Sequence, residues 1–430
     1  MAQAATALPT SQFSRREPAA TTATTTGDML IVLVVLAAGL GIWCLRRPDQ
    51  LLHPYVWADE YHVLNRYQSQ GAVLAALAPV KGYFIWPTSF TVAFGAWGDF
   101  LHLPEVEYWC ATAWYLATLC LLLVPGSTLA LRARALMALL LVLAPMNPEV
   151  FGVALYSFWW ASLWPAITLT WSKDYWWSRT LALLVGGMSS LAGAAMVLPY
   201  AVRALMGKQR RDLISAGVLA TAAAAQAGAY FTSARSQRTR LQLAPVAEQE
   251  LRNFGYYPLS WLRHAPPVLL GALGVSVLVF VALCASRRAQ VKNGRRLEVY
   301  VPLVIALVVV GVLCAVPAPL STSPSSAGPR YYFLPFVLLS WVLVAVLCFG
   351  RDRWRRAVAA ALVAGALAGV GANFSRHEPA VSWQAQLSRC RGAEGAFYVP
   401  VQFTGAPSQM WAHALIIRPS TCRGLGYPLR

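Results

Sequence analysis

Two adjacent acidic residues, Asp59 and Glu60, lie shortly beyond the first hydrophobic segment and are flanked by Trp57 and Tyr61. Acidic residues are scarce in this chain, with 17 among 430, so the pair stands out. A carboxylate that is partly withdrawn from water near a bilayer can act as a general base and accept the proton of an attacking hydroxyl group. An acid at this place can also cap the helix predicted to follow it. The two roles are compatible, because such a helix would present the pair.

A second candidate is the dipeptide Arg330-Tyr331, which opens the hydrophobic segment 331–349 directly after Gly328-Pro329. An arginine at a helix start can bind a phosphate group through two parallel charge-assisted hydrogen bonds. The neighbouring aromatic ring can pack against a sugar or a lipid. The alternative is an interfacial anchor, because tyrosine and arginine are both enriched where a helix leaves the membrane.

Glu149 lies in a turn between two predicted spans, where a carboxylate is costly unless it has a partner or a function. Trp159 and Trp160 belong to the aromatic stretch that follows and could line a sugar-binding cavity. The alternative is an aromatic belt with a capping acid. His62 follows the acidic pair closely and is a candidate supporting residue.

The composition predicts the elements that must position these residues. Hydrophobic residues make up 57% and charged residues 12% of the chain, whereas soluble domains carry about 25% charged residues. Apolar runs of about 17–22 residues match the hydrocarbon thickness of a bilayer, and they lack the alternation of barrel strands. We therefore predict an all-α polytopic membrane protein with about 9–11 transmembrane helices and external juxtamembrane helices. The net charge of +18 gathers in short loops between spans, which indicates membrane topology rather than a nucleic-acid partner.

Five basic connecting segments set the predicted topology, because basic loops favour the cytoplasmic side. All five can be cytoplasmic only if residues 83–102 form an external amphipathic or re-entrant segment and residues 180–202 form a broken hairpin that enters and leaves on one side. The alternative is that 180–202 is one ordinary span. The predicted spans are 29–45, 107–125, 135–147, 150–170, 213–231, 267–286, 299–318, 331–349 and 357–372.

Three regions follow from this topology: a disordered cytoplasmic tail at 1–28, a transmembrane catalytic bundle at 29–372 and a small external segment at 373–430. Cys390 and Cys422 both lie in that last segment, so an external location predicts a disulfide between them. The other six cysteines lie in apolar spans and are expected to be small buried hydrophobes.

No motif for a cofactor is present. Asp99, His102, Glu105 and Glu107 are close in sequence, but their spacing matches no strong metal motif, and solvated external side chains are the simpler interpretation. The sequence contains no Gly-rich phosphate loop, nucleotide fingerprint or serine elbow. We therefore expect no cofactor, and a divalent metal is possible but not indicated. A transferase that uses a nucleotide sugar would need a soluble domain on the basic side, where no loop exceeds about a dozen residues, so a lipid-linked donor is the natural remaining substrate.

These features resemble the GT-C superfamily, the integral-membrane glycosyltransferases that take sugar from a polyprenyl phosphate or pyrophosphate carrier. Such proteins carry an acidic pair in the first external loop, as Asp59-Glu60 here, and short broken helices in mid-chain, similar to 180–202. Many carry an external Arg-Tyr near a late helix start, similar to Arg330-Tyr331. The resemblance covers roughly residues 29–372 at the level of architecture, and the acidic pair is its sequence motif.

The resemblance implies an inverting glycosyltransferase of a bacterial plasma membrane, which moves a monosaccharide from a polyprenyl-phosphate donor to an extracytoplasmic glycan or lipid-linked acceptor. Asp59 would accept the acceptor proton, Glu60 would orient or assist, and Arg330 would hold the departing phosphate. The active site and the C-terminus would be extracytoplasmic and the N-terminus cytoplasmic. Two other classes stay open: a transporter or flippase of a lipid-linked sugar, and a non-catalytic subunit of an envelope polysaccharide assembly complex.

Overall fold

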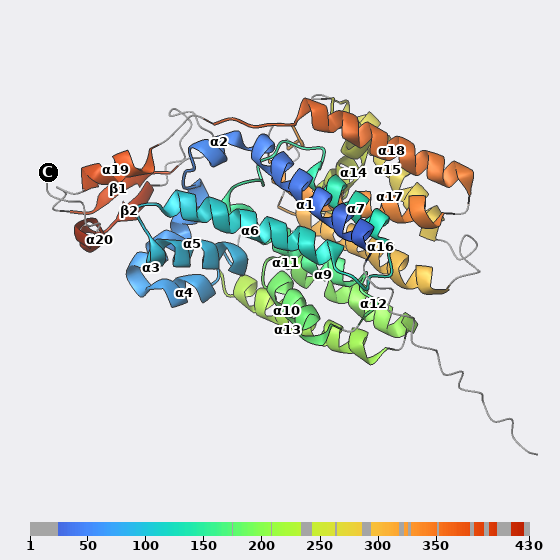
Figure 1. Ribbon diagram of the computed structural model, residues 1–430, viewed down its shortest axis with the longest axis horizontal. Coiled ribbons are helices and arrows are strands. Elements are labelled where there is room, and N and C mark those ends of the chain that lie inside the picture. Colours follow the sequence, from blue (N-terminus) through green and yellow to red (C-terminus); the bar gives the residue numbers. More distant parts are fainter. Residues whose placement is uncertain are drawn as a thin grey trace, which may run out of the picture.

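Long apolar helices dominate the fold (Figure 1). The computed structural model describes residues 25–173, 175–207, 209–233, 243–262, 265–285, 294–317, 322–325, 328–350, 352–378, 382–390, 395–401 and 414–424. Within these ranges seven helices are long and apolar enough to cross a membrane, which confirms a multi-pass α-helical membrane protein. They are α1 (Thr26–Arg46), α6 (Leu103–Leu123), α13 (Arg210–Phe231), α15 (Pro267–Ala285), α16 (Gly294–Ala315), α17 (Arg330–Phe349) and α18 (Arg353–Ala372).

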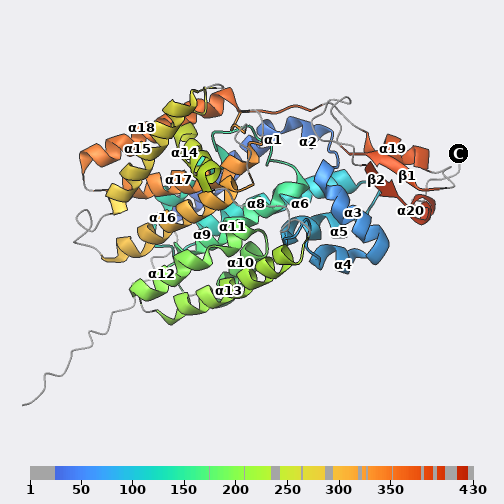
Figure 2. The same ribbon diagram turned by 180° about the vertical axis from the view of Figure 1, so that it is seen from behind.

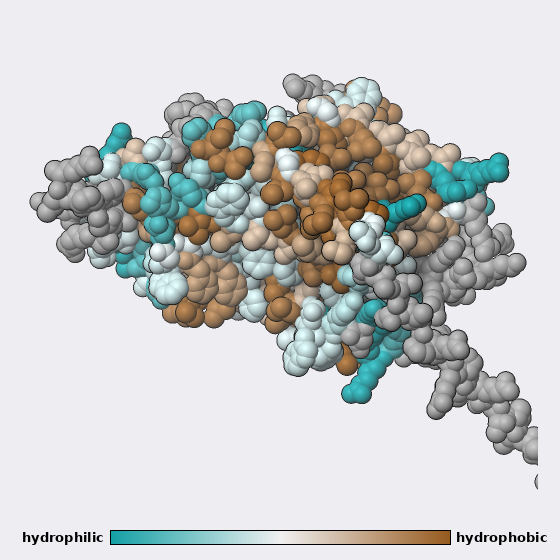
Figure 3. Space-filling view, in the orientation of Figure 1, coloured by the Kyte–Doolittle hydropathy of each residue, from teal (hydrophilic) through white to brown (hydrophobic). Residues whose placement is uncertain are grey.

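The surface matches this assignment. Hydrophobic residues form a broad band across the middle of the molecule, and hydrophilic residues gather toward its two ends (Figure 3). Helix α17 is the central helix, because nearly all of its side chains are buried, whereas α1 exposes Leu30, Leu33 and Val34 on its outer face. An apolar outer face is what lipid contact requires.

Two predicted spans differ from the expectation of continuous helices. Residues 135–147 correspond to α7 (Leu131–Val142), which is too short to cross alone and continues as non-helical chain to Met146. The predicted span 150–170 is wrong as one helix, because it consists of η2 (Ala154–Tyr156), α8 (Ser157–Ser162) and α9 (Trp164–Thr168). Pro165 removes one backbone donor and interrupts helical bonding there. Broken helices persist at this depth because all of these residues are buried inside protein.

Both interrupted segments nevertheless run from one end of the bundle to the other. Arg134 near the start of α7 donates to the carbonyl groups of Leu123 and Val124, whereas Met146 accepts a hydrogen bond from Arg46 at the last residue of α1. We call the end that holds residues 46–60 and 146–156 the Asp59 end. The opposite end holds residues 123–131 and 169–173.

The predicted break within 180–202 is confirmed. This segment forms α10 (Trp176–Gly187), α11 (Leu191–Ala194) and α12 (Val197–Gly207). Arg179 in α10 donates to the carbonyl group of Trp171, and Arg203 in α12 donates to that of Leu169. The two arms therefore leave from and return to the opposite end of the bundle, as a hairpin does.

Close backbone packing holds this hairpin shut. A Cβ atom on Gly193 would collide with the carbonyl oxygen of Gly186, and one on Gly186 would collide with Pro165. We expect Gly193→Ala to lower the free energy of unfolding by about 1–3 kcal/mol through overpacking. Gly217→Ala is the matched control, since nothing lies within 4 Å of its added Cβ, and it should be neutral or stabilising. Denaturant titration in mixed micelles measures both, and equal effects would contradict the packing argument.

Short helices assemble at the Asp59 end (Figure 1). They are α2 (Pro48–Leu52), η1 (Ala58–Glu60), α3 (Tyr61–Gln70), α4 (Ala72–Leu77) and α5 (Trp86–Gly98). Helix α5 has only 13 residues and is not among the helices long enough to cross, as expected for the segment 83–102. Its exposed Phe94 and Trp97, together with Leu74 of α4, leave this corner strongly apolar.

On the far side of the bundle, α14 (Leu243–Leu259) and α15 form a tightly packed pair, seen with α16 and α18 in the reverse view (Figure 2). Gly255 and Gly274 lie against the backbone carbonyl groups of Leu270 and Leu251, where a Cβ atom would not fit. Small residues at such contacts let membrane helices approach closely.

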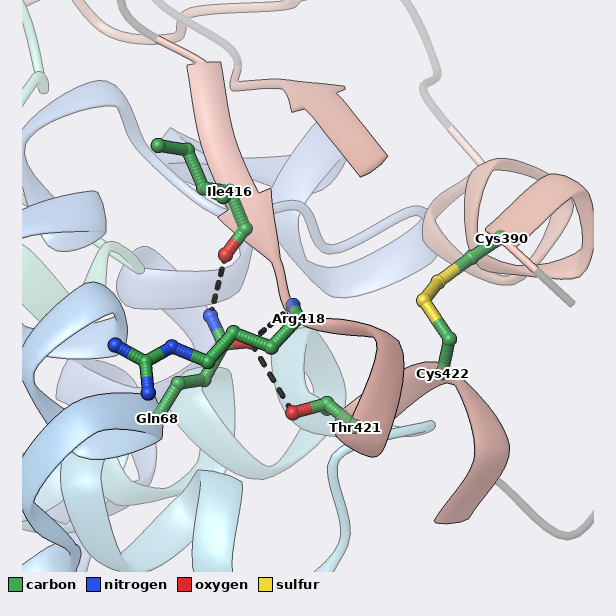
Figure 4. Close-up of a disulfide and its surroundings, with 6 residues drawn as sticks. All are labelled: Gln68, Cys390, Ile416, Arg418, Thr421 and Cys422. Carbon is green, nitrogen blue, oxygen red and sulfur yellow. Dashed lines mark hydrogen bonds between the residues drawn. A yellow bond between two sulfur atoms is a disulfide. The ribbon is translucent and has the colours of Figure 1, made fainter. Parts of the chain in front are cut away.

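The C-terminal segment forms a small module beside α3, built from α19 (Trp383–Cys390), β1 (Phe397–Pro400), β2 (Ala414–Ile417) and α20 (Pro419–Gly424). The two strands pair antiparallel, and the predicted disulfide joins Cys390 to Cys422. Gln68 at the end of α3 bonds to Ile416, Arg418 and Thr421, which ties the module to the Asp59 end (Figure 4).

Candidate active site

The two acidic residues face in different directions: Glu60 is buried, and Asp59 is partly exposed. Glu60 is 1% exposed, and its two carboxylate oxygens accept hydrogen bonds from the backbone N–H groups of Trp57 and Leu155, each at 2.6 Å. The first bond closes the η1 turn, and the second ties that turn to η2. Glu60 is therefore withdrawn from a substrate, and of its two expected roles, to orient or to assist, this position fits the orienting one.

Asp59 points the other way and is partly exposed. Its Oδ1 lies 2.7 Å from Nζ of Lys81, and the two side chains are 29% and 36% exposed. Lys81 adopts a left-handed backbone conformation with φ of 50° and is followed by Gly82 at φ of 87°. A residue with a Cβ rarely adopts that conformation. The tight turn formed by Lys81 and Gly82 places the ammonium group next to Asp59.

Glu149 and Arg330 meet although 181 positions separate them in sequence. Nη1 of Arg330 lies 2.6 Å from Oε1 of Glu149, and the hydroxyl group of Tyr156 donates to the same oxygen at 2.7 Å. Glu149 is 3% exposed, so its charge is compensated inside the protein. The other oxygen of Glu149 is buried and has no hydrogen-bond partner among the described residues.

Tyr156 lies between the Glu149–Arg330 pair and Trp57. Its ring lies 6.2 Å from that of Trp57, the residue that the Glu60 carboxylate caps. Asp59, Lys81, Glu149 and Arg330 are two carboxylates and two cations at the same end of the bundle, in two ion pairs. We call these four residues and Tyr156 the site cluster.

A further layer of cations and acids surrounds the site cluster. The guanidinium of Arg376 lies 5.6 Å from the centre of the Trp57 ring, and it pairs with Glu378 at 2.6 Å. Arg47 and Asp49 form a buried pair at 2.9 Å. Through Trp57 and Asn147, Arg376 ties the chain that follows α18 to the Asp59 end.

The other predicted site residues lie apart from the ion pairs. Trp160 is 1% exposed and packs against Trp43, Tyr115, Phe151 and Phe333. Its N–H group donates to the carbonyl of Val150 at 3.0 Å. This tryptophan is therefore part of the core and does not line a sugar cavity.

Trp159 is also buried, at 8% exposure, and its indole N–H has no partner among the described residues. His62 is half-buried on α3 and lies against the ring of Tyr61, with centroids 3.9 Å apart. Tyr331 lies under the guanidinium of Arg330 at 5.0 Å, so it stays next to the site cluster as expected.

The acidic residues around position 102 do not assemble as a set. Asp99 and His102 pair with each other at 2.8 Å on the surface, whereas Glu107 turns inward and is 2% exposed. In the part of the chain that the structure describes, no group of three or more His, Cys, Asp and Glu side chains could hold a metal ion.

The sequence analysis did not identify three residues of the site cluster and its surroundings: Lys81, Tyr156 and Arg376. A signal was present for one of them, because Lys81 is the only charged residue between Tyr67 and Gly98. Tyr156 lies in the aromatic stretch after Glu149, where its type does not set it apart, and nothing in the sequence links Arg376 to Trp57.

No protein-family model, no curated protein and no solved structure significantly matches this chain.

Proposed function

We propose that this protein is an inverting membrane glycosyltransferase, which moves a monosaccharide from a polyprenyl-phosphate donor to a glycan or lipid-linked acceptor on the extracytoplasmic side of a bacterial plasma membrane. The observation that carries the proposal is the site cluster. It brings a partly exposed carboxylate, Asp59, to the same end of a membrane bundle as two cations, Lys81 and Arg330. A base beside cations suits a hydroxyl group that attacks a sugar phosphate.

In the proposed reaction the acceptor oxygen attacks the anomeric carbon, the bond from that carbon to the phosphate oxygen breaks, and the polyprenyl phosphate departs with both bonding electrons. Asp59 takes the acceptor proton. Arg330 and Lys81 stabilise the negative charge that grows on the leaving phosphate.

Lys81 and Arg330 each pair with an acidic side chain before the donor binds. These pairs determine the order of steps in the proposed reaction. Lys81 is bound to Asp59, and its side chain is 36% exposed. An arriving phosphate competes for this ammonium group, and once Lys81 turns to the phosphate, Asp59 is released as a base. Arg330 is held by Glu149 on one side, which orients its remaining N–H groups.

The transporter alternative depends on the hairpin α10–α11–α12 as a substrate site. In the structure Ser162 and Ser190 bond to each other at 2.7 Å, and Gly193 lies against Gly186, so the interior of the hairpin is filled by protein. This packing favours the enzyme. A non-catalytic subunit would tolerate neutral side chains at Asp59 and Arg330.

The test is sugar transfer in proteoliposomes that contain the purified protein and a panel of radiolabelled polyprenyl-phosphate sugars, with a glycan extract as acceptor. The expected result is a labelled product with at least one donor. Labelled lipid that moves between leaflets without a product would indicate a flippase, and no product with any donor together with unimpaired Asp59 variants in cells would favour the subunit.

A further inference from the structure

Gln226 is a fully buried polar residue in α13, one of the helices long enough to cross the membrane. A buried amide is costly unless its hydrogen bonds are made. The Oε1 atom of Gln226 accepts a hydrogen bond from the backbone N–H group of Phe84 at 2.9 Å. Its Nε2 atom donates to the carbonyl groups of Phe84 and Gly187, each at 3.1 Å. One side chain therefore joins α13 to the chain before α5 and to the end of α10.

Phe84 directly follows the turn that carries Lys81. This turn, residues 80–83, is closed by two backbone hydrogen bonds between Val80 and Tyr83, at 2.9 and 3.2 Å. Both central residues have positive φ, as in a type I′ turn. Lys81 is the only non-glycine residue with positive φ in the described ranges. Such a backbone conformation is unfavourable and persists only where the surrounding structure fixes it.

The surrounding contacts fix the Lys81 turn on both sides. Before the turn, Arg66 of α3 donates to the carbonyl group of Pro79 at 3.0 Å. After the turn, Gln226 binds the backbone of the chain. Within the turn, a Cβ atom on Gly82 would stand 2.8 Å from the Cβ atom of Ser233, so the turn lies directly against the residues that follow α13.

The broken hairpin supports the same attachment. Gly187 and Met188 lie where its first arm ends, at the end of α10. Gly187 accepts a bond from Gln226, and the N–H group of Trp86 donates to the carbonyl group of Met188 at 3.2 Å. A Cβ atom on Gly187 would stand 2.7 Å from that of Ala222, so α10 and α13 touch at this level. The break in 180–202 therefore provides a support for the chain that leaves the Lys81 turn.

We propose that Gln226 is a positioning residue, whose amide holds the Lys81 turn against α13 and the hairpin and thereby keeps the Lys81 ammonium group beside Asp59. The attachment stands on geometry alone, whereas its effect on sugar transfer rests on the proposed function. Gln226 acts through the backbone of Phe84. A cation that stabilises a leaving phosphate must stay in place, because a displacement of about 1 Å can lower a rate about 100-fold.

The first arm of the test needs no substrate. The full chain in mixed micelles reacts briefly with a water-soluble N-hydroxysuccinimide ester, and mass spectrometry compares acylation of Lys81 with that of Lys173, an exposed lysine at the opposite end. Gln226→Leu should raise this ratio about two- to fivefold, toward the value in Asp59→Asn, because the ammonium group leaves its ion pair. An unchanged ratio would overturn the proposal.

Thr112→Val is the matched control for Gln226→Leu. It also removes a buried hydrogen bond between two helices, the bond that the Trp43 indole donates to Thr112 at 3.1 Å. This bond joins α1 to α6 and takes no part in the Lys81 turn, so the acylation ratio should stay at the wild-type value. An equal rise in both variants would indicate general loosening of the bundle and would overturn the specific attachment.

A second variant keeps the test decisive if Gln226→Leu does not fold. Gly82→Ala pushes the turn away from α13, because the added Cβ collides with Ser233. Gly71→Ala is its control: Gly71 has φ of 83°, close to the 87° of Gly82, but nothing lies within 4 Å of its added Cβ. Only Gly82→Ala should raise the acylation ratio of Lys81, and equal ratios in the two variants would contradict a turn held by α13.

The second arm measures sugar transfer in proteoliposomes. Gln226→Leu should lower kcat about tenfold or more in the wild-type background. Added to Lys81→Gln, it should change the rate little, because the cation that it positions is already absent. Equal losses in both backgrounds would overturn the positioning role. If the first arm succeeds and no donor gives transfer, the proposed function fails and the attachment of the Lys81 turn stands.

Discussion

Replacing Asp59 by asparagine should reduce sugar transfer by about 100-fold or more, because an amide cannot accept the proton of the acceptor hydroxyl. The fold should survive this change. Asp59 is partly exposed and pairs with a partly exposed Lys81, and such surface pairs contribute only about 0–1 kcal/mol to stability. Transfer rates in proteoliposomes and unfolding titrations on the same preparations separate the two effects.

Asp99→Asn is the matched control for this substitution. Asp99 is an exposed carboxylate at the same end of the molecule and pairs with His102 at 2.8 Å, so it resembles Asp59 in setting but lies outside the site cluster. It should keep full activity. Retention of most of the wild-type rate by Asp59→Asn would remove Asp59 as the base, and equal losses in both variants would point to a general effect of charge at this end.

The second large effect concerns the Arg330–Glu149 pair. Arg330→Met should lower the free energy of unfolding by about 3–5 kcal/mol, since it leaves the buried Glu149 carboxylate without its cation. Adding Glu149→Gln should recover part of that loss, because the buried charge is then removed as well. The pair is coupled, so the double variant should be more stable than the sum of the single effects by about 0.5–3 kcal/mol.

The double variant also separates folding from chemistry. If Arg330 stabilises the departing phosphate, Arg330→Met with Glu149→Gln should be folded yet about 100- to 1,000-fold slower in transfer. Arg252 and Glu248 form the control pair, because this ion pair is half exposed on the glutamate side and should give a coupling below about 1 kcal/mol. Additive stabilities at 330 and 149, or a fast double variant, would contradict the assigned role.

Much of the architecture follows from composition. Hydrophobic runs without charge predicted the seven long helices, because a backbone in lipid must satisfy its own hydrogen bonds. The Gly- and Ser-rich stretch predicted the break in 180–202, and the two cysteines of the C-terminal segment predicted their disulfide. The error lay at 150–170, where hydrophobicity concealed a broken helix, since buried protein can satisfy backbone groups that lipid cannot.

The candidate site was predicted only in part. Asp59, Glu149 and Arg330 stood out in the sequence because charged residues near a membrane span are costly unless they have a function or a partner. Their pairing was not visible. Glu149 and Arg330 are 181 positions apart, and Lys81 reaches Asp59 only through a left-handed turn.

The sequence by itself therefore determined the membrane-spanning class, the long helices and which charged residues require an explanation, because hydropathy and the cost of buried charge are local properties. Only the tertiary structure decided that Glu60 is buried and bound by two backbone N–H groups, that Trp160 is a core residue, and that Tyr156 and Arg330 bind the same oxygen of Glu149. Those outcomes depend on which side of a helix faces its neighbours, and that direction is set by packing between segments far apart in the chain.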